Sequence, residues 1–190
     1  MSEITAKTKI LNAASVLFYN YGISNTGINL ITDRAKVAKM SLYNNYSTKS
    51  DLIKDYIKLN IDDWLKRYRQ KEQIISSPIE GVIAIFDTYI DYSSAVYEKG
   101  YRGCSLLNAA TEFELNSEEL LYIRNHKENI RKIIEKHLLN IFHNNEKVRS
   151  LSSLISYILE GAVIKAGLDG KSDKLFEAKS LALGVIVGNY

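Results

Sequence analysis

The clearest structural signal in this chain lies in residues 28–49, INLITDRAKVAKMSLYNNYSTK. The apolar residues of this stretch recur at steps of three and four, which predicts two short helices over about residues 28–34 and 39–45. Leu42 and Tyr46 are spaced to pack the second helix onto its support. A connector of about three or four residues between two short helices is typical of a helix-turn-helix motif.

The outward face of the second helix carries polar groups and no carboxylate. Lysine, serine, tyrosine and asparagine can bond phosphate oxygens or base edges, whereas an acidic side chain would be repelled there. We therefore predict that this face contacts DNA, with Lys49 beyond its end and Thr26 as the cap of the preceding helix. The residues of the face are Lys39, Met40, Ser41, Tyr43, Asn44 and Asn45.

Positive charge is concentrated at the N-terminal end. Residues 1–50 contain six lysines and arginines and two acids, a net charge of +4, whereas the whole chain carries +3. The remainder is therefore close to neutral. A modest positive field confined to one end suits contact with a duplex.

The composition is that of a globular helical protein. Hydrophobic residues make up 46% and charged residues 25%, and a single proline in 190 residues leaves few helix breakers. No apolar run approaches the roughly 18 residues of a membrane span, and the N-terminus lacks the apolar core of a signal peptide. The single cysteine cannot form an internal disulfide. These features favour the cytoplasm.

Apolar stripes and capping residues predict an all-α chain of about nine helices in two domains, residues 1–50 and 51–190. A long helix ending near residue 69 should belong to both domains, since it begins beside the predicted DNA contact. Ser77-Pro78-Ile79-Glu80 combines a capping box with proline at the first helical position. A helix should therefore start there, and its apolar stripe predicts an end near Glu98.

Residues 10–53 resemble the N-terminal domain of the tetracycline-repressor (TetR/AcrR) family of bacterial regulators. Both the order and the spacing of the matching residues fit. The chain departs from the family pattern at Gly27 and Ala38, where Ser or Thr is usual, and at Lys36, where the turn usually has Gly. The matching residues are Ile10, Leu11, Ala13, Ala14, Leu17, Phe18, Tyr21, Gly22, Thr26, Ile31, Ala35, Val37, Lys39, Leu42, Tyr43, Tyr46, Lys49 and Leu52.

The resemblance implies a ligand-responsive regulator, usually a repressor, that binds a pseudo-palindromic operator in double-stranded DNA as a homodimer. A small molecule would release it, and residues 51–190 would bind that ligand and dimerise. In the family, residues matching Lys39, Tyr43 and Lys49 meet the sugar–phosphate backbone, and those matching Met40 and Tyr43 approach bases. The ligand, the operator, the regulated genes and the choice between repression and activation stay open.

The last two predicted helices, residues 147–168 and 173–188, are unusually apolar and rich in small residues. From the residues alone they form either a buried core hairpin or half of an intersubunit four-helix bundle. Because TetR-like proteins dimerise through their last helices, the resemblance favours the bundle. The expected interface residues are Leu154, Ile158, Gly161, Ala162, Ala178, Ala182 and Val185.

Aromatic residues are concentrated in the middle helices, and each of the chain's 13 tyrosine hydroxyls needs a partner if it is buried. Such positions are more often core than pocket, but an aromatic cavity with a few polar groups would meet this need. Residues 102–113 also resemble a segment near the ligand-binding region of a subset of TetR-like proteins. The expected lining of an apolar cavity for a lipophilic effector is Trp64, Tyr68, Phe86, Tyr89, Cys104, Asn108, Phe113, Tyr122 and His126.

Neither catalysis nor a metal or other cofactor is predicted. His126, His137 and His143 show no metal-ligand spacing with Cys104, and the chain has no glycine-rich phosphate loop. Two alternatives to the ligand-released repressor stay open. One is a helical enzyme or lipophile-binding protein without a DNA-binding role. The other is a regulator whose trigger is a protein partner.

Overall fold

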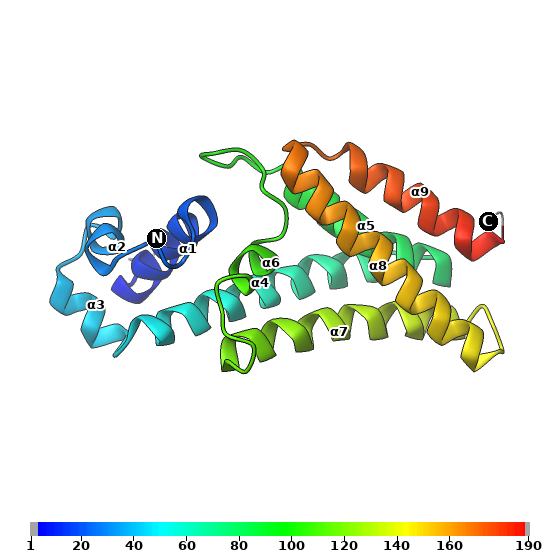
Figure 1. The fold of residues 1–190 in the computed structure, drawn as a ribbon, viewed down its shortest axis with the longest axis horizontal. Helices are drawn as coiled ribbons and strands as arrows, with labels where there is room; N and C mark the ends of the chain where they lie inside the picture. Colours follow the sequence, from blue (N-terminus) through cyan, green and yellow to red (C-terminus); the bar gives the residue numbers. More distant parts are fainter. Residues whose placement is uncertain (1–3, 189–190) are drawn as a thin grey trace. The chain divides into compact units, whose positions relative to one another are not determined.

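The computed structural model describes residues 4–188, and over this range every regular element is an α-helix, nine in all (Figure 1). The expected all-α class is confirmed. The helices are α1 (Ala6–Tyr21), α2 (Ile28–Ala35), α3 (Lys39–Asn45), α4 (Lys49–Glu72), α5 (Pro78–Ser93), α6 (Ser105–Ala110), α7 (Glu118–Leu139), α8 (Asn145–Asp169) and α9 (Asp173–Val187).

Two compact units divide the chain. The first comprises the residues up to Ile61 together with Ser105–Ile123, and the second comprises Asp62–Cys104 together with the residues from Arg124 onward. The division runs through α4 and α7, so each of these helices contributes one end to either unit. The domain boundary expected after residue 50 stays a prediction, and α4 continues unbroken past that residue.

Helix α1 is the centre of the first unit and packs on α2, α3 and α6. Its apolar stripe is buried, and Phe18 meets Tyr56 of α4 edge-on, with ring centroids 5.3 Å apart. The helix begins where the Thr5 hydroxyl accepts the Thr8 N–H over 3.2 Å, and it ends at Gly22, whose φ is 87°. Helix α1 therefore supports the helix-turn-helix from behind.

In the second unit, α9 packs on both α5 and α8. The expected start of α5 is confirmed, because the Ser77 hydroxyl accepts the Glu80 N–H and Pro78 is the first helical residue. The expected end at Glu98 is wrong, because α5 ends at Ser93. Val96, three residues beyond this end, is fully exposed and so has no apolar surface to pack on.

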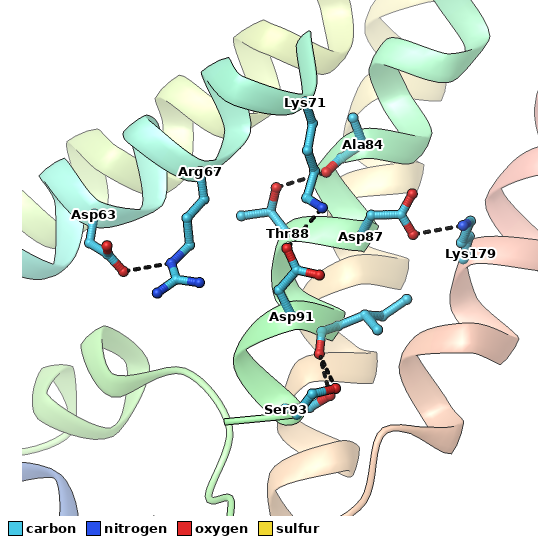
Figure 2. A network of polar contacts seen from close by, with 11 residues as sticks. Asp63, Arg67, Lys71, Ala84, Asp87, Thr88, Asp91, Ser93 and Lys179 are labelled. Atoms are coloured by element: carbon cyan, nitrogen blue, oxygen red, sulfur yellow. Dashed lines mark hydrogen bonds and ion pairs between the residues drawn. The ribbon is translucent and has the colours of Figure 1, made fainter. Parts of the chain in front are cut away.

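Acidic side chains of α5 connect it to helices on two sides (Figure 2). Asp87 pairs with Lys179 of α9 over 2.6 Å, and Asp91, one turn later, pairs with Lys71 of α4 over 2.8 Å. On α4, Arg67 bonds Asp63 over 2.9 Å. Pairs this accessible to solvent contribute less than about 1 kcal/mol each, so we expect them to fix helix orientation more than stability.

Helix α8 corrects the expectation that no segment of the chain is apolar enough to span a membrane. By length and composition alone α8 could do so, since a window within it has a mean hydropathy of 1.4. Only 28% of that window is buried inside the chain, although α8 packs on α9 along one side. The apolar side chains of α8 that are not buried inside the chain therefore lie on its outer side, where a second copy of the chain could cover them.

Candidate functional site

The helix-turn-helix forms as predicted, with α2 and α3 joined through Lys36, Val37 and Ala38 (Figure 1). Lys36 has the left-handed backbone angles φ 54° and ψ 48°, and its N–H donates to the Asp33 carbonyl over 3.3 Å. The Val37 N–H reaches the Thr32 carbonyl over 3.2 Å. Ala38 precedes α3 and offers no side-chain cap, in line with its departure from the family pattern.

The two faces of α3 differ in burial and chemistry. On the inner side, Leu42 is completely buried, and Tyr46, just beyond the helix, is 3% exposed. The outer face has no acidic residue among those described. Ammonium, thioether, phenol and amide groups stand in solvent there, and a duplex can be contacted by all of them. The exposed members are Lys39, Met40, Tyr43 and Asn44.

Thr26 does not cap α2. Its side chain is completely buried, and its hydroxyl donates to the Gly22 carbonyl over 2.6 Å. Gly27 holds the N-cap position of α2, where no side-chain cap bond forms. The expected cap is therefore wrong, because the hydroxyl has turned back to the end of α1. It is also poorly placed to meet a phosphate at the rim of the DNA contact.

Asn45 and Lys49 are half-buried and hydrogen-bonded within the first unit. The Asn45 amide donates to the carbonyl of Ser41, itself half-buried, over 2.7 Å. The Lys49 ammonium donates to the Ile23 carbonyl over 2.6 Å. Burial lowers the pKa of Lys49, and the nearby carboxylate of Glu112 opposes the shift. The Lys49 ammonium has three N–H donors, so it can meet a phosphate and keep the bond to the Ile23 carbonyl.

Glu112 holds the turn between α1 and α2, a role that no sequence pattern indicated. One carboxylate oxygen accepts the Ile23 N–H over 2.8 Å, and the other accepts the Ser24 N–H over 2.7 Å. A Cβ at Gly22 would approach Glu112 Oε1 to 3.1 Å, so glycine gives the carboxylate room. Burial alone would raise the pKa of Glu112, but the two N–H donors and Lys49 hold it below its usual value. The chain just after α6 is thus fixed to the helix-turn-helix.

An aromatic cluster in the second unit is centred on Trp64 of α4. Tyr68 stacks on it at 5.4 Å, Tyr89 of α5 lies at 6.0 Å, and His126 of α7 meets it edge-on at 5.3 Å between ring centroids. All four side chains are buried, and neither the Trp64 Nε1 nor the His126 Nδ1 has a hydrogen-bond partner within the described residues. Burial, with a contribution from the charge of Lys127, lowers the pKa of His126 to about 4, so the ring is neutral at pH 7.

Lys127 adds a half-buried cation beside this cluster. Its ammonium lies 2.9 Å from the Tyr89 hydroxyl, 3.7 Å from the Cys104 sulfur and 3.1 Å from a Glu160 carboxylate oxygen. Burial alone would lower its pKa, but these three neighbours raise it well above the usual value. Lys127 and Glu160 were missed in the sequence, because a lysine in a charged helix and an acid within the apolar stretch of another helix give no periodic signal.

The nine residues expected to line a cavity are divided between the two units. Trp64, Tyr68, Phe86, Tyr89, Cys104 and His126 belong to the second unit, whereas Asn108, Phe113 and Tyr122 belong to the first. Tyr122 is 47% exposed, and its hydroxyl donates to Glu118 over 3.2 Å. The structure therefore assembles the Trp64 cluster and leaves Tyr122 outside it.

The expected dimer residues fall into two groups. Ala162, Ala178 and Ala182 are buried inside the protomer, because they form the contact of α8 and α9 with their own neighbours. Leu154 and Gly161 are exposed, and Ile158 and Val185 are half-buried. The sequence did not distinguish the inner stripe from the outer one. The exposed apolar stripe, which we call the α8–α9 outer face, consists of Leu154, Tyr157, Ile164, Leu168, Phe176, Leu183 and Val187.

Comparison with known proteins links the whole chain to one fold. Residues 10–56 match the family model of bacterial regulatory proteins, tetR family. A TetR-family transcriptional regulator from Streptomyces coelicolor is 21% identical with a TM-score of 0.83, over 96% of this chain and 93% of that chain. A TetR transcriptional regulator from Legionella pneumophila is 21% identical with a TM-score of 0.81, over 97% and 99%. One from Chloroflexus aurantiacus is 20% identical with a TM-score of 0.78, over 95% and 93%. No curated protein gives a significant match.

An N-terminal helix-turn-helix followed by an all-helical body defines a bacterial DNA-binding regulator. Residues 10–56 belong to the TetR family of bacterial transcriptional regulators, and the rest of the chain has the fold of TetR-family structures. The protein is therefore a DNA-binding transcriptional regulator, and regulators of this family are not enzymes. This membership sets aside the alternative of a helical enzyme or lipophile-binding protein without a DNA-binding role.

Proposed function

We propose that the protein is a repressor that binds a pseudo-palindromic operator as a homodimer and is released by a small lipophilic molecule in the cytoplasm. The observation that carries the proposal is the acid-free, exposed face of α3, next to a helix, α4, that continues to Trp64. A change around Trp64 can therefore act on the helix that begins beside the DNA contact.

The DNA contact is assigned to the outer face of α3 and its flanks. Lys39 and Tyr43 would meet phosphates, and Met40, Tyr43 and Asn44 would approach base edges in the major groove. Ser41, Asn45 and Lys49, which are half-buried, can join them from the edge of this face. This division predicts that Lys39→Ala weakens binding to every sequence, whereas Asn44→Ala relaxes the choice among sequences.

The α8–α9 outer face is the proposed dimer interface. Tyr157 is 73% exposed and Leu168 is 76% exposed, and large apolar side chains in a contiguous stripe usually mark an interaction site. Two such helix pairs would form an intersubunit four-helix bundle, in which Gly161, with open space around its Cβ position, permits close approach.

The Trp64 cluster is the proposed effector site. The indole Nε1 can only donate a hydrogen bond, so a ligand that satisfies it must offer an acceptor. A charged ligand would add an uncompensated charge next to the Lys127–Glu160 pair, which is already neutral as a whole. These groups favour a neutral planar aromatic molecule with a carbonyl or ether oxygen.

Trp64 is the only tryptophan in the chain, so its emission tests the effector site directly. Neutral aromatic ketones should quench Trp64 fluorescence and release the protein from DNA at matching concentrations, and aromatic carboxylates or cationic dyes should do neither. His126→Phe should abolish the response and leave DNA binding intact, with Tyr122→Phe as the matched control. If no compound quenched Trp64 and DNA binding still responded to a purified protein partner, the small-molecule proposal would fail.

A further inference from the structure

Lys36 occupies a costly backbone conformation. Within residues 4–188 it is the only non-glycine residue with a positive φ, 54°. In this left-handed region the Cβ crowds the following carbonyl oxygen, and glycine or asparagine adopts it far more easily. The turn before α3 therefore requires a left-handed backbone conformation at this position, but it does not require a lysine side chain.

The Lys36 ammonium is not bonded to any described residue of the protein. The side chain is exposed and forms no ion pair or side-chain hydrogen bond with any described residue. Some lysines of the same unit are engaged, since Lys7 pairs with Asp55 over 2.9 Å and Lys49 bonds the Ile23 carbonyl, whereas Lys39 forms no such bond with the described residues. The charge of Lys36 is thus left for an external partner.

The surroundings indicate what that partner is. Lys36 lies between α2 and α3, close in sequence to Lys39, and no acid follows it on α3. A polyanion that meets the outer face of α3 therefore finds these two unpaired cations at one end of the helix. A lysine on a flexible stem binds phosphate as a point charge and carries little sequence information.

We infer that Lys36 is an additional phosphate contact, retained in a conformation that lowers stability because its charge strengthens DNA binding. The inference rests on the DNA-binding role of the domain. The competing explanation is that the cation only interacts favourably with the carboxyl end of the α2 dipole. The two explanations predict different behaviour for stability and for affinity.

Three substitutions separate backbone strain from charge. Lys36→Gly removes both, Lys36→Gln removes the charge and keeps a side chain in the left-handed conformation, and Lys36→Arg keeps both. Binding is measured by fluorescence anisotropy on a labelled duplex of arbitrary sequence and on the DNA flanking the protein's own gene, over a salt titration. Thermal unfolding is followed at one fixed protein concentration.

Lys36→Gly should become more stable and bind more weakly, two changes in opposite directions. Its melting temperature should rise by about 2–4 °C. The slope of log K against log salt should fall by about one per protomer, which at 0.15 M salt is roughly 30-fold in affinity for a dimer. Lys36→Gln should lose the same affinity without the gain in stability, and Lys36→Arg should match the wild type.

Two results would overturn the inference while DNA binding by the wild type stands. One is an unchanged affinity and salt slope in both Lys36→Gly and Lys36→Gln. The other is a loss of stability in Lys36→Gln with affinity intact, which would assign the charge to the α2 dipole. A wild type that bound neither duplex at any salt concentration would instead overturn the DNA-binding proposal and the inference together.

Discussion

At the scale of single residues, Glu112 connects the chain after α6 to the turn that leads into the helix-turn-helix. Replacing it by glutamine leaves one oxygen for two N–H donors, those of Ile23 and Ser24. We expect Glu112→Gln to lower the free energy of unfolding by about 1 kcal/mol, at the low end for a charged hydrogen bond because the carboxylate is solvent-accessible. Urea unfolding at pH 7 measures the change, and Glu114→Gln, at an exposed position just beyond it, is the control.

The effect of Glu112→Gln should also depend on pH with a definite sign. Since the pKa of Glu112 is lower in the folded state, its contribution is present above the unfolded-state pKa and is lost as pH falls through the folded-state value. The difference between wild type and Glu112→Gln should therefore shrink below about pH 4.5. A difference that stayed constant down to pH 3 would show that the carboxylate charge is not what holds the turn.

His126 gives the second prediction at this scale. Its pKa is lowered to about 4 by burial, so the unfolded chain takes up a proton near pH 6.5 while the folded chain stays neutral. Stability is thus fully present above about pH 6.5 and is lost as pH falls toward 4, by on the order of 2 kcal/mol between pH 7 and 4.5. Urea titrations should find this loss much reduced in His126→Gln and unchanged in His143→Gln. Equal losses in all three proteins would contradict a buried, neutral His126.

The roles of individual residues were harder to predict from the sequence than the positions of the helices. The outer face of α3 follows from helical period alone, because Leu42 and Tyr46 define which side is inside. The destination of the Thr26 hydroxyl does not, because a threonine before a helix can bond forward to the helix or backward to the preceding turn. Lys127 was hidden for a similar reason: its partners Tyr89 and Glu160 come from other helices, and helical spacing carries no information about them.

At the scale of elements, apolar stripes and caps determined most helix positions. Ser77 with Pro78 marked the start of α5 because both act locally. The end of α5 depended on where its packing partners stop, which is a tertiary property. For α8 and α9 the ends were predictable but the buried side was not. Each of these helices has two apolar sides, and helical periodicity alone does not show which side is internal. That ambiguity explains why Ala182 was expected at the interface although it is buried in the protomer.

Assembly through the α8–α9 outer face is tested by placing charge on it. Ile164→Glu combined with Leu168→Glu should convert the dimer to a monomer with unchanged helix content, because two carboxylates per chain would be buried without partners. Sedimentation velocity at micromolar concentration measures the state. Val96→Glu, at a fully exposed apolar position elsewhere, should remain dimeric. A wild type that sedimented as a monomer and still bound operator specifically would contradict the proposed interface.

At the scale of the whole molecule, one helix connects the DNA-binding unit with the proposed effector site. Helix α4 begins at Lys49, whose ammonium bonds the turn before α2, and carries Trp64 further along. An effector needs only to bind the DNA-incompetent state better than the competent one. A coupling of about 1–3 kcal/mol corresponds to a change of roughly 5–150-fold in operator affinity. Nothing in the sequence identifies the proposed ligand, because the Trp64 cluster and the Lys127–Glu160 pair bring together side chains from α4, α5, α7 and α8.

We propose that a dimer reads a pseudo-palindromic operator through two copies of α3. The most direct measurement is nuclease footprinting of the purified protein on the DNA flanking its own gene, in the presence of excess competitor DNA. We predict one protected region with two inverted half-sites, their centres about one helical turn or a small multiple of it apart, that is lost in the Ile164→Glu, Leu168→Glu variant. Protection without inverted half-sites, or no protection at any salt concentration that keeps the protein folded, would contradict the claim.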